Sequence, residues 1–243
     1  MKFALITAPN GFEILDVLHL SYHLVLAQYK DDYAYLSRYK VAHRLGDFVM
    51  VDNGAAELGR SIPFEQVLDF ANAIRADEVI LPDVLDDSVA TVKSSIETAH
   101  FLPPKKCAVV PQGSNWDEWT WCLKELLSLG CRTICIAKRY ERLPGGRPHA
   151  LGILRKMDLL DRYDIHLLGF DGDPLKEIRE ALACYQGIRG VDSAVPLAWA
   201  QQGMQLGEAH RSYTWGGRFV GALATYNARQ ILSACNTEFI CTS

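Results

Sequence analysis

Residues 48–53 have the sequence FVMVDN, a short run of apolar and β-branched residues that ends in two polar ones. Such a run, closed by a turn residue at Gly54, is typical of a buried strand. Similar runs recur along the chain with helical patterns between them, which predicts repeated β–α units around a parallel sheet. The predicted strands are 2–8, 48–53, 77–83, 107–112, 132–137, 165–170 and 189–195. The predicted helices are 63–75, 88–101, 115–129, 148–162 and 174–186.

The length of the chain, 243 residues, suits one barrel of β–α units. We therefore predict the α/β class and a single-domain (β/α)₈ TIM-type barrel over residues 1–243, although periodicity alone does not separate it from an open doubly wound sheet. The last strand is assigned to 218–224, with the sequence RFVGALA. The tyrosine-rich segment 14–46 is predicted to be a helical insertion or an oligomer surface.

The composition limits the classes of partner and compartment. The formal net charge of −4 gives no general attraction to a polyanion, so any nucleic-acid contact must be local. The seven cysteines form no CxxC or CxC pair, which favours reduced core thiols over disulfides or a four-ligand zinc site. No apolar run approaches the roughly eighteen residues of a membrane span, and the N-terminus has no cleavage site. We expect a cytoplasmic protein without membrane contact.

Polar residues stand at the carboxyl ends of four predicted strands. They are Asp52, Asp83, Gln112 and Asp192. Parallel β–α folds bind their ligands beyond this end of the strands, so these side chains should converge on one mouth. A buried carboxylate is costly unless it is paired or used, and three of them at one mouth are hard to explain as packing.

Structural explanations stay open for part of this set. Asp52 is also placed to cap a turn with Gly54, and Gln112 to satisfy backbone groups of a loop. Asp192 favours function, because a strand normally has an apolar or hydroxyl residue there. His166 lies inside a predicted strand, far from any HxH or HxxxH spacing, and is interpreted as a core residue.

The stretch 132–156 is basic, with a single acidic residue. We interpret it as a mobile loop beyond the fifth strand, on the same face as the carboxylates, where it would contact phosphates of a nucleic acid. A solvated surface explains the charges equally well. The cations predicted to meet phosphates are Lys138, Arg139, Arg142 and Arg147.

Five short motifs occur in a familiar order: VDNGAAE at 51–57, LPDVLDD at 81–87, VVPQG at 109–113, IHLLG at 165–169 and GVDSAVP at 190–196. Their order and spacing resemble the tRNA-guanine transglycosylase family. In size, the chain is most similar to the 7-deazaguanine DNA transglycosylases of bacteriophages and bacteria. The resemblance covers about residues 48–196.

The resemblance implies a role for each matching residue. Asp192 corresponds to the nucleophile, and Asp52 to the general acid and base. Asp83 and Gln112 correspond to the residues that contact the edge of guanine. Asn53, Gly113 and Leu168 complete the base-binding set that the resemblance implies.

Three positions depart from the family pattern. Ala56 stands where the family has an aromatic residue that stacks on the base, so stacking falls to Leu168 and Phe170. Residues 137–139 replace a Gly-Gly-Leu run that contacts the base through its backbone. The CxCxxC motif and distant histidine of the C-terminal zinc module are absent, which argues against a standard tRNA substrate.

The resemblance therefore implies an enzyme, a pentosyltransferase that replaces guanine in DNA with a 7-deazaguanine through a covalent aspartyl–sugar intermediate. The implied partners are guanine-containing DNA and a free base such as 7-cyano-7-deazaguanine. The chemistry requires no metal or organic cofactor. A protein partner and a homo-oligomer both stay open. The alternatives are a tRNA-guanine transglycosylase, a non-catalytic nucleic-acid-binding subunit, and a nucleoside or sugar hydrolase on the same barrel.

Overall fold

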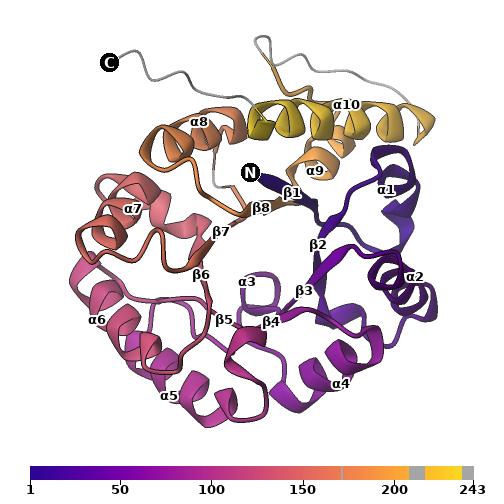
Figure 1. Cartoon of the computed structure of the whole chain (residues 1–243). Helices are drawn as coiled ribbons and strands as arrows, with labels where there is room; N and C mark the ends of the chain where they lie inside the picture. The colour runs from indigo at the N-terminus through magenta and orange to yellow at the C-terminus, as the bar shows by residue number, and fades with distance from the viewer. Residues whose placement is uncertain (171, 208–216, 237–243) are drawn as a thin grey trace.

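The computed structural model describes residues 1–170, 172–207 and 217–236, and within them the strands form one eight-stranded parallel sheet. The order in the sheet is β1-β8-β7-β6-β5-β4-β3-β2, and its end strands, β1 and β2, lie side by side. The sheet is a nearly closed barrel inside a ring of helices (Figure 1), which confirms the (β/α)₈ prediction. The strands are β1 (Lys2–Leu5), β2 (Tyr22–Leu26), β3 (Phe48–Asp52), β4 (Glu78–Ile80), β5 (Cys107–Val109), β6 (Thr133–Ala137), β7 (Asp164–Leu168) and β8 (Gly190–Ser193).

Helices follow the strands and cover the outside of the barrel (Figure 1). Several begin at a side chain that caps the first turn: Asp87, Asn115 and Asp173 each accept a hydrogen bond from a backbone N–H. The α-helices are α1 (Phe12–Leu18), α2 (Tyr33–Arg44), α3 (Ala55–Leu58), α4 (Phe64–Ile74), α5 (Ser88–Ala99), α6 (Trp116–Leu127), α7 (Gly146–Lys156), α8 (Pro174–Cys184), α9 (Val195–Gln201) and α10 (Gly217–Asn236). Short 3₁₀ segments are η1 (Pro9–Gly11), η2 (Ala27–Tyr29), η3 (Pro104–Lys106) and η4 (Lys138–Arg142).

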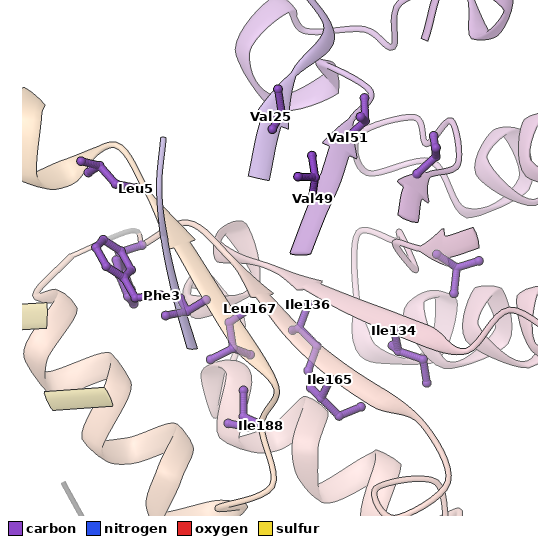
Figure 2. Packing of buried hydrophobic residues seen from close by; sticks show 14 of the residues in the cluster. Phe3, Leu5, Val25, Val49, Val51, Ile134, Ile136, Ile165, Leu167 and Ile188 are labelled. Carbon is purple, nitrogen blue, oxygen red and sulfur yellow. The ribbon is translucent and has the colours of Figure 1, made fainter. Parts of the chain in front are cut away.

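Alternation along the strands separates two layers of buried side chains. The larger core lies between the sheet and the helices and includes Phe3, Leu5, Val49 and Val51. Figure 2 shows part of this core. The residues between these four, such as Ala4 and Met50, form a smaller cluster inside the barrel. The side chains that carry chemistry project into this interior.

The register fixes which polar residues share that interior. Asp192 pairs with Ala4 on β1, and His166 pairs with Cys135 on β6. Both partners belong to the inner cluster, so Asp192 and His166 also point inward. Asp52 is two residues beyond Met50, on the same side of β3.

The prediction that 14–46 is a helical insertion is wrong. This segment contains β2, which pairs with β3 along its whole length, and α2, one of the helices of the ring. Every residue of β2 is buried. A strand buried on both faces has no polar alternation, and β2 has only five residues between two helices, so periodicity does not reveal it.

The assignment of a strand to 218–224 is also wrong, because these residues lie within α10. A short apolar run fits a strand and a buried helix equally well. The preceding described helix, α9, packs against α10, and α10 contacts β1 from outside the barrel, so α10 is a helix of the ring and does not extend the sheet.

The basic stretch 132–156 is not a mobile loop. It comprises β6, η4 and α7, with only Leu143–Gly145 between the last two. Positive φ at Gly145 and Gly146 allows the chain to turn sharply into α7.

In the described residues, five of the cysteines are buried and none forms a disulfide. No helix of this part of the chain has the length and apolar character to cross a membrane.

Candidate functional site

A cavity of about 450 Å³ opens at the carboxyl end of the barrel strands. Its volume is that of an ordinary small-molecule site. The cavity brings together the four strand-end residues that the sequence singled out, from β3, β8 and the ends of β4 and β5. They are Asp52, Asp83, Gln112 and Asp192.

Asp83 is buried between two amides. Its Oδ1 accepts a hydrogen bond from Asn53 Nδ2 at 2.7 Å, and its Oδ2 accepts one from Gln112 Nε2 at 2.5 Å. Burial raises the pKa of Asp83, and the two donated hydrogen bonds oppose that rise by stabilising the carboxylate. The three side chains form one hydrogen-bonded group of donors and acceptors beside the cavity.

Both amides are fixed on their other side. Asn53 also donates to the carbonyl oxygen of Leu81 at 2.8 Å and accepts from the backbone of Ala55 at 2.9 Å. Gln112 Oε1 accepts from the hydroxyl of Tyr140 at 2.9 Å. Because each amide oxygen has its own donor, both NH₂ groups must face Asp83.

Gly113 does not line the cavity. Its N–H donates to the hydroxyl of Tyr140 at 3.1 Å. A Cβ at this position would lie 2.5 Å from the backbone nitrogen of Trp119, so glycine is needed for the close approach of α6. Gly113 supports Gln112 through Tyr140 instead of facing a ligand.

Asp52 ends β3 and is half-buried. Its Oδ2 accepts the N–H of Gly54 at 2.9 Å, so the predicted turn interaction is present. Burial raises the pKa of Asp52 well above its usual range, and the nearby Glu57 carboxylate raises it further. Asp52 therefore caps the turn at Gly54 and is also a carboxyl group with a raised pKa at the cavity, so both interpretations of the sequence apply to it.

Glu57 is a fourth carboxylate at the cavity, and the sequence reasoning missed it. Gly54, with a φ of 82°, starts the single turn of α3 that brings Glu57 to the rim. Burial raises the pKa of Glu57, and Asp192 adds to the rise while Lys138 opposes it. A signal was present in the motif at 51–57, which places a second acid five residues after Asp52.

Asp192 is buried at the end of β8, and both of its oxygens have donors. Oδ1 lies 2.8 Å from Nε2 of His166, and Oδ2 accepts the N–H of Gly169 at 3.2 Å. These contacts hold the carboxylate in one orientation at the wall of the cavity. His166, interpreted from the sequence as a core residue, is thus a direct partner of a cavity carboxylate.

The cationic side of the cavity comes from η4. Lys138, Arg139 and Arg142 line the cavity, on the same face as the carboxylates, and their contact with phosphates stays a prediction. Arg139 forms an ion pair with Asp86 of the neighbouring loop. The basic residues therefore lie at the rim, close to the carboxylates and with the opposite charge.

Arg147 is not a surface cation, which corrects the prediction that it meets phosphates. It is 1% exposed and donates to the carbonyl oxygens of Leu168 at 2.7 Å and Gly169 at 2.6 Å. The sequence alone does not distinguish a buried arginine on α7 from an exposed one. Its function is to hold the end of β7, where Leu168 and Gly169 line the cavity.

The apolar part of the wall includes Leu168 and Phe170, which the sequence proposed as a surface for stacking. Ala56 also lies at the wall of the cavity. Among the described residues, no group of three or more His, Cys, Asp and Glu side chains is arranged to hold a metal ion.

A scan of protein-family models and a search of curated proteins found no match to this chain.

Proposed function

We propose that the protein is a base-exchange enzyme that replaces guanine in DNA with a 7-deazaguanine through a covalent intermediate on Asp192. The observation that carries the proposal is the pair of unlike carboxylates in one cavity. Asp192 accepts two hydrogen bonds, whereas the pKa of Asp52 is raised by burial and by Glu57. A nucleophile and a general acid require these two environments.

In the first half-reaction, an oxygen of Asp192 attacks C1′ of the sugar as the bond from C1′ to N9 of guanine breaks. The electron pair of that bond moves onto the base, which takes a proton from the carboxyl group of Asp52. The products are an ester between Asp192 and C1′, free guanine and ionised Asp52. The transition state has the oxocarbenium character that a nearby carboxylate stabilises in retaining glycosidases.

The second half-reaction runs the same steps with a different base. The incoming 7-deazaguanine gives its N9 proton to Asp52, and N9 attacks C1′. The ester bond to Asp192 breaks, and its electron pair returns to the carboxylate. Asp52 ends protonated, so the enzyme is restored and no redox partner is needed.

The group formed by Asp83, Asn53 and Gln112 suits the edge of guanine. The remaining lone pairs of Asp83 accept the N1–H and N2–H₂ donors of guanine, and the second amide hydrogen of Gln112 reaches O6. Adenine has no donor at N1 or N2 and would leave Asp83 unpaired. Such a mismatch in a dry site is worth several kcal/mol, about a thousandfold or more in specificity.

The rim supports a nucleic-acid substrate instead of a free nucleoside. Lys138 and Arg142, with Arg139, place cations beside the entrance, where they offset the phosphates that flank a flipped nucleotide. The net charge of −4 agrees with a contact confined to this rim.

Transfer of labelled base tests the proposal. Wild type, Asp192→Asn and Asp52→Asn are incubated with radiolabelled guanine or 7-cyano-7-deazaguanine and with guanine-containing DNA or, in parallel, tRNA. The exposed Asp31 provides a matched control, Asp31→Asn. We expect label in DNA with wild type and the control, and a loss of at least about a thousandfold with either site variant. A DNA–protein adduct stable to denaturant should form with wild type and not with Asp192→Asn.

Each alternative predicts a different result. Label in tRNA alone would assign the substrate to RNA. Release of base from either polymer without uptake of label would identify a hydrolase. Binding of DNA without either reaction would identify a non-catalytic subunit. Any of these three results would overturn the proposed exchange in DNA.

A further inference from the structure

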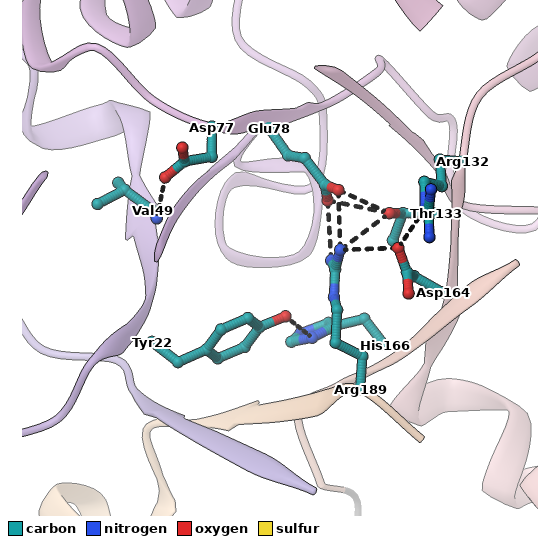
Figure 3. A network of polar contacts seen from close by, with 9 residues as sticks. All are labelled: Tyr22, Val49, Asp77, Glu78, Arg132, Thr133, Asp164, His166 and Arg189. Atoms are coloured by element: carbon teal, nitrogen blue, oxygen red, sulfur yellow. Dashed lines mark hydrogen bonds and ion pairs between the residues drawn. The ribbon is translucent and has the colours of Figure 1, made fainter. Parts of the chain in front are cut away.

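Beneath the cavity, a chain of hydrogen bonds leads from the barrel interior to Asp192. The hydroxyl of Tyr22 lies 2.8 Å from Nδ1 of His166, and Nε2 of the same ring lies 2.8 Å from Oδ1 of Asp192. All three residues are at most 2% exposed. Figure 3 shows Tyr22 of β2 and His166 of β7 meeting inside the barrel.

The donors and acceptors in this chain define one arrangement of hydrogens. An ionised carboxylate only accepts, so the hydrogen between His166 and Asp192 belongs to Nε2. In a neutral imidazole, Nδ1 then accepts, and the hydroxyl of Tyr22 donates to it. Burial raises the pKa of Tyr22 above its usual value, which keeps that hydroxyl protonated.

The position of Tyr22 is itself built into the barrel. A Cβ at residue 190 would lie 2.6 Å from the ring of Tyr22, so Gly190 leaves the space that the ring fills. The ring also stacks on Phe48 with a centroid distance of 5.1 Å. Tyr22 can therefore hold its hydroxyl at Nδ1 without displacing the strand beside it.

Other charged groups near His166 are already compensated. Arg189 lies beside Tyr22, and its guanidinium donates two hydrogen bonds of 2.8 Å to Glu78 (Figure 3). Tyr22 and Asp192 contact the ring of His166, Cys135 pairs with His166 between β6 and β7, and Arg189 and Glu78 act on Tyr22. Within this set, Asp192 is the carboxylate that contacts the ring.

We propose that His166 is a positioning residue for Asp192, and that Tyr22 fixes His166 as the neutral Nε2–H tautomer. His166 and the N–H of Gly169 occupy two of the roughly four lone-pair sites of the carboxylate. The other two stay available for C1′ of the substrate. The positioning role rests on the proposed base exchange, whereas the tautomer can be measured without it.

The first test is the tautomer of His166 in the wild-type protein. Nitrogen-15 NMR of histidine-labelled protein, with His166→Gln to assign the signal, should show a protonated Nε2 and an unprotonated Nδ1. Tyr22→Phe removes the donor to Nδ1 and should shift the Nδ1 signal, whereas Tyr39→Phe, at a buried tyrosine outside the barrel, should leave that signal unchanged. Protonation at Nδ1 in the wild type would overturn the proposal, whether or not the protein exchanges bases.

The second test separates kcat from KM in the exchange assay. His166→Leu removes the donor, and we expect kcat to fall about a hundredfold with KM little changed, because a misplaced reacting group costs about that much. His166→Gln returns an N–H near the position of Nε2 and should recover most of the loss. The exposed His100→Gln provides the control.

The two hypotheses fail in different ways. If the wild type exchanges no base, the proposed function fails, and the NMR result alone decides the His166 assignment. If the wild type is active and folded His166→Leu retains full kcat, the positioning role fails while base exchange stands. Urea unfolding of each variant distinguishes a loss of activity from a loss of fold.

Discussion

Asp52 and Asp192 are the same residue type at the ends of two strands, yet their surroundings differ. Asp192 has a ring N–H and a backbone N–H as donors. Asp52 has one backbone donor and a neighbouring Glu57 carboxylate. Two identical side chains therefore have different environments, one among hydrogen-bond donors and the other beside a like charge, which is the difference that the proposed base exchange requires.

The raised pKa of Asp52 makes a prediction about stability and pH. A carboxyl group whose pKa is higher in the folded state stabilises the protein at low pH and loses that contribution as pH rises through the folded-state value. Asp52→Asn removes this loss. Relative to wild type, the variant should therefore gain stability from mildly acidic to mildly alkaline pH, reaching about 1 kcal/mol.

Urea unfolding of both proteins across that pH range measures the difference. Asp31→Asn should show no such trend, because the side chain of Asp31 is 87% exposed. Parallel curves for wild type and Asp52→Asn would show that Asp52 has the same affinity for protons in the folded and unfolded states.

Among the elements, α2 and α7 each support the barrel, although the sequence predicted an insertion over the first and a mobile loop over the second. α2 follows β2 and packs on α4, so it is part of the ring and not an appendage. α7 contributes Arg147, which reaches the end of β7 from beneath the cavity wall. Both helices hold a strand end, because Tyr35 of α2 accepts the N–H of Leu26 at the end of β2.

The cap of α2 tests whether this helix belongs to the cooperative unit. The side chain of Asp32 accepts the N–H of Tyr35 at 2.8 Å. Asp32→Ala should lower the global free energy of unfolding by about 1 kcal/mol, and Asp31→Ala by much less. If α2 were an independent insertion, its cap would change only a local transition and leave the main urea midpoint in place.

Arg147 tests the support of β7 by α7. Its guanidinium also lies 3.8 Å from Glu141 and 3.9 Å from Glu177. Arg147→Met would leave buried carbonyl and carboxylate groups without these contacts, and we expect a loss of about 3 kcal/mol. Lys156→Met, on the exposed face of the same helix, is the control. A loss no larger than that of the control would show that water replaces the guanidinium.

Over the whole molecule, the two ends of the barrel have different tasks. The carboxyl end holds the cavity, whereas the amino end is closed by Glu78, Arg189 and Thr133 (Figure 3). The ion pair joins residues 111 positions apart, on β4 and just before β8. Such a pair links distant β–α units and contributes nothing to the cavity wall directly.

Breaking that ion pair should weaken the entire barrel. Arg189→Met leaves Glu78 as an uncompensated buried charge, and we expect a loss of about 3 kcal/mol in one cooperative transition. The double variant Glu78→Leu with Arg189→Met should recover most of the loss. Arg132→Met, at a mostly exposed arginine, should have little effect. A double variant less stable than Arg189→Met would contradict this explanation.

The β–α architecture and the polar residues at four strand ends follow from local patterns in the sequence. Alternating apolar runs and helical patterns specify parallel units, and parallel strands must bring their carboxyl ends to one side. For that reason the sequence predicts correctly that four residues lie at one cavity: Asp52, Asp83, Gln112 and Asp192.

The contacts of those residues depend on the tertiary fold and do not follow from local patterns. β2 is a strand because β3 pairs with it, Arg147 is buried because the end of β7 covers it, and His166 is a partner of Asp192 because β7 and β8 are adjacent. Each of these facts depends on contacts between residues distant in the chain. Local periodicity records which face of an element is buried, and it carries no information about the partner on the other side.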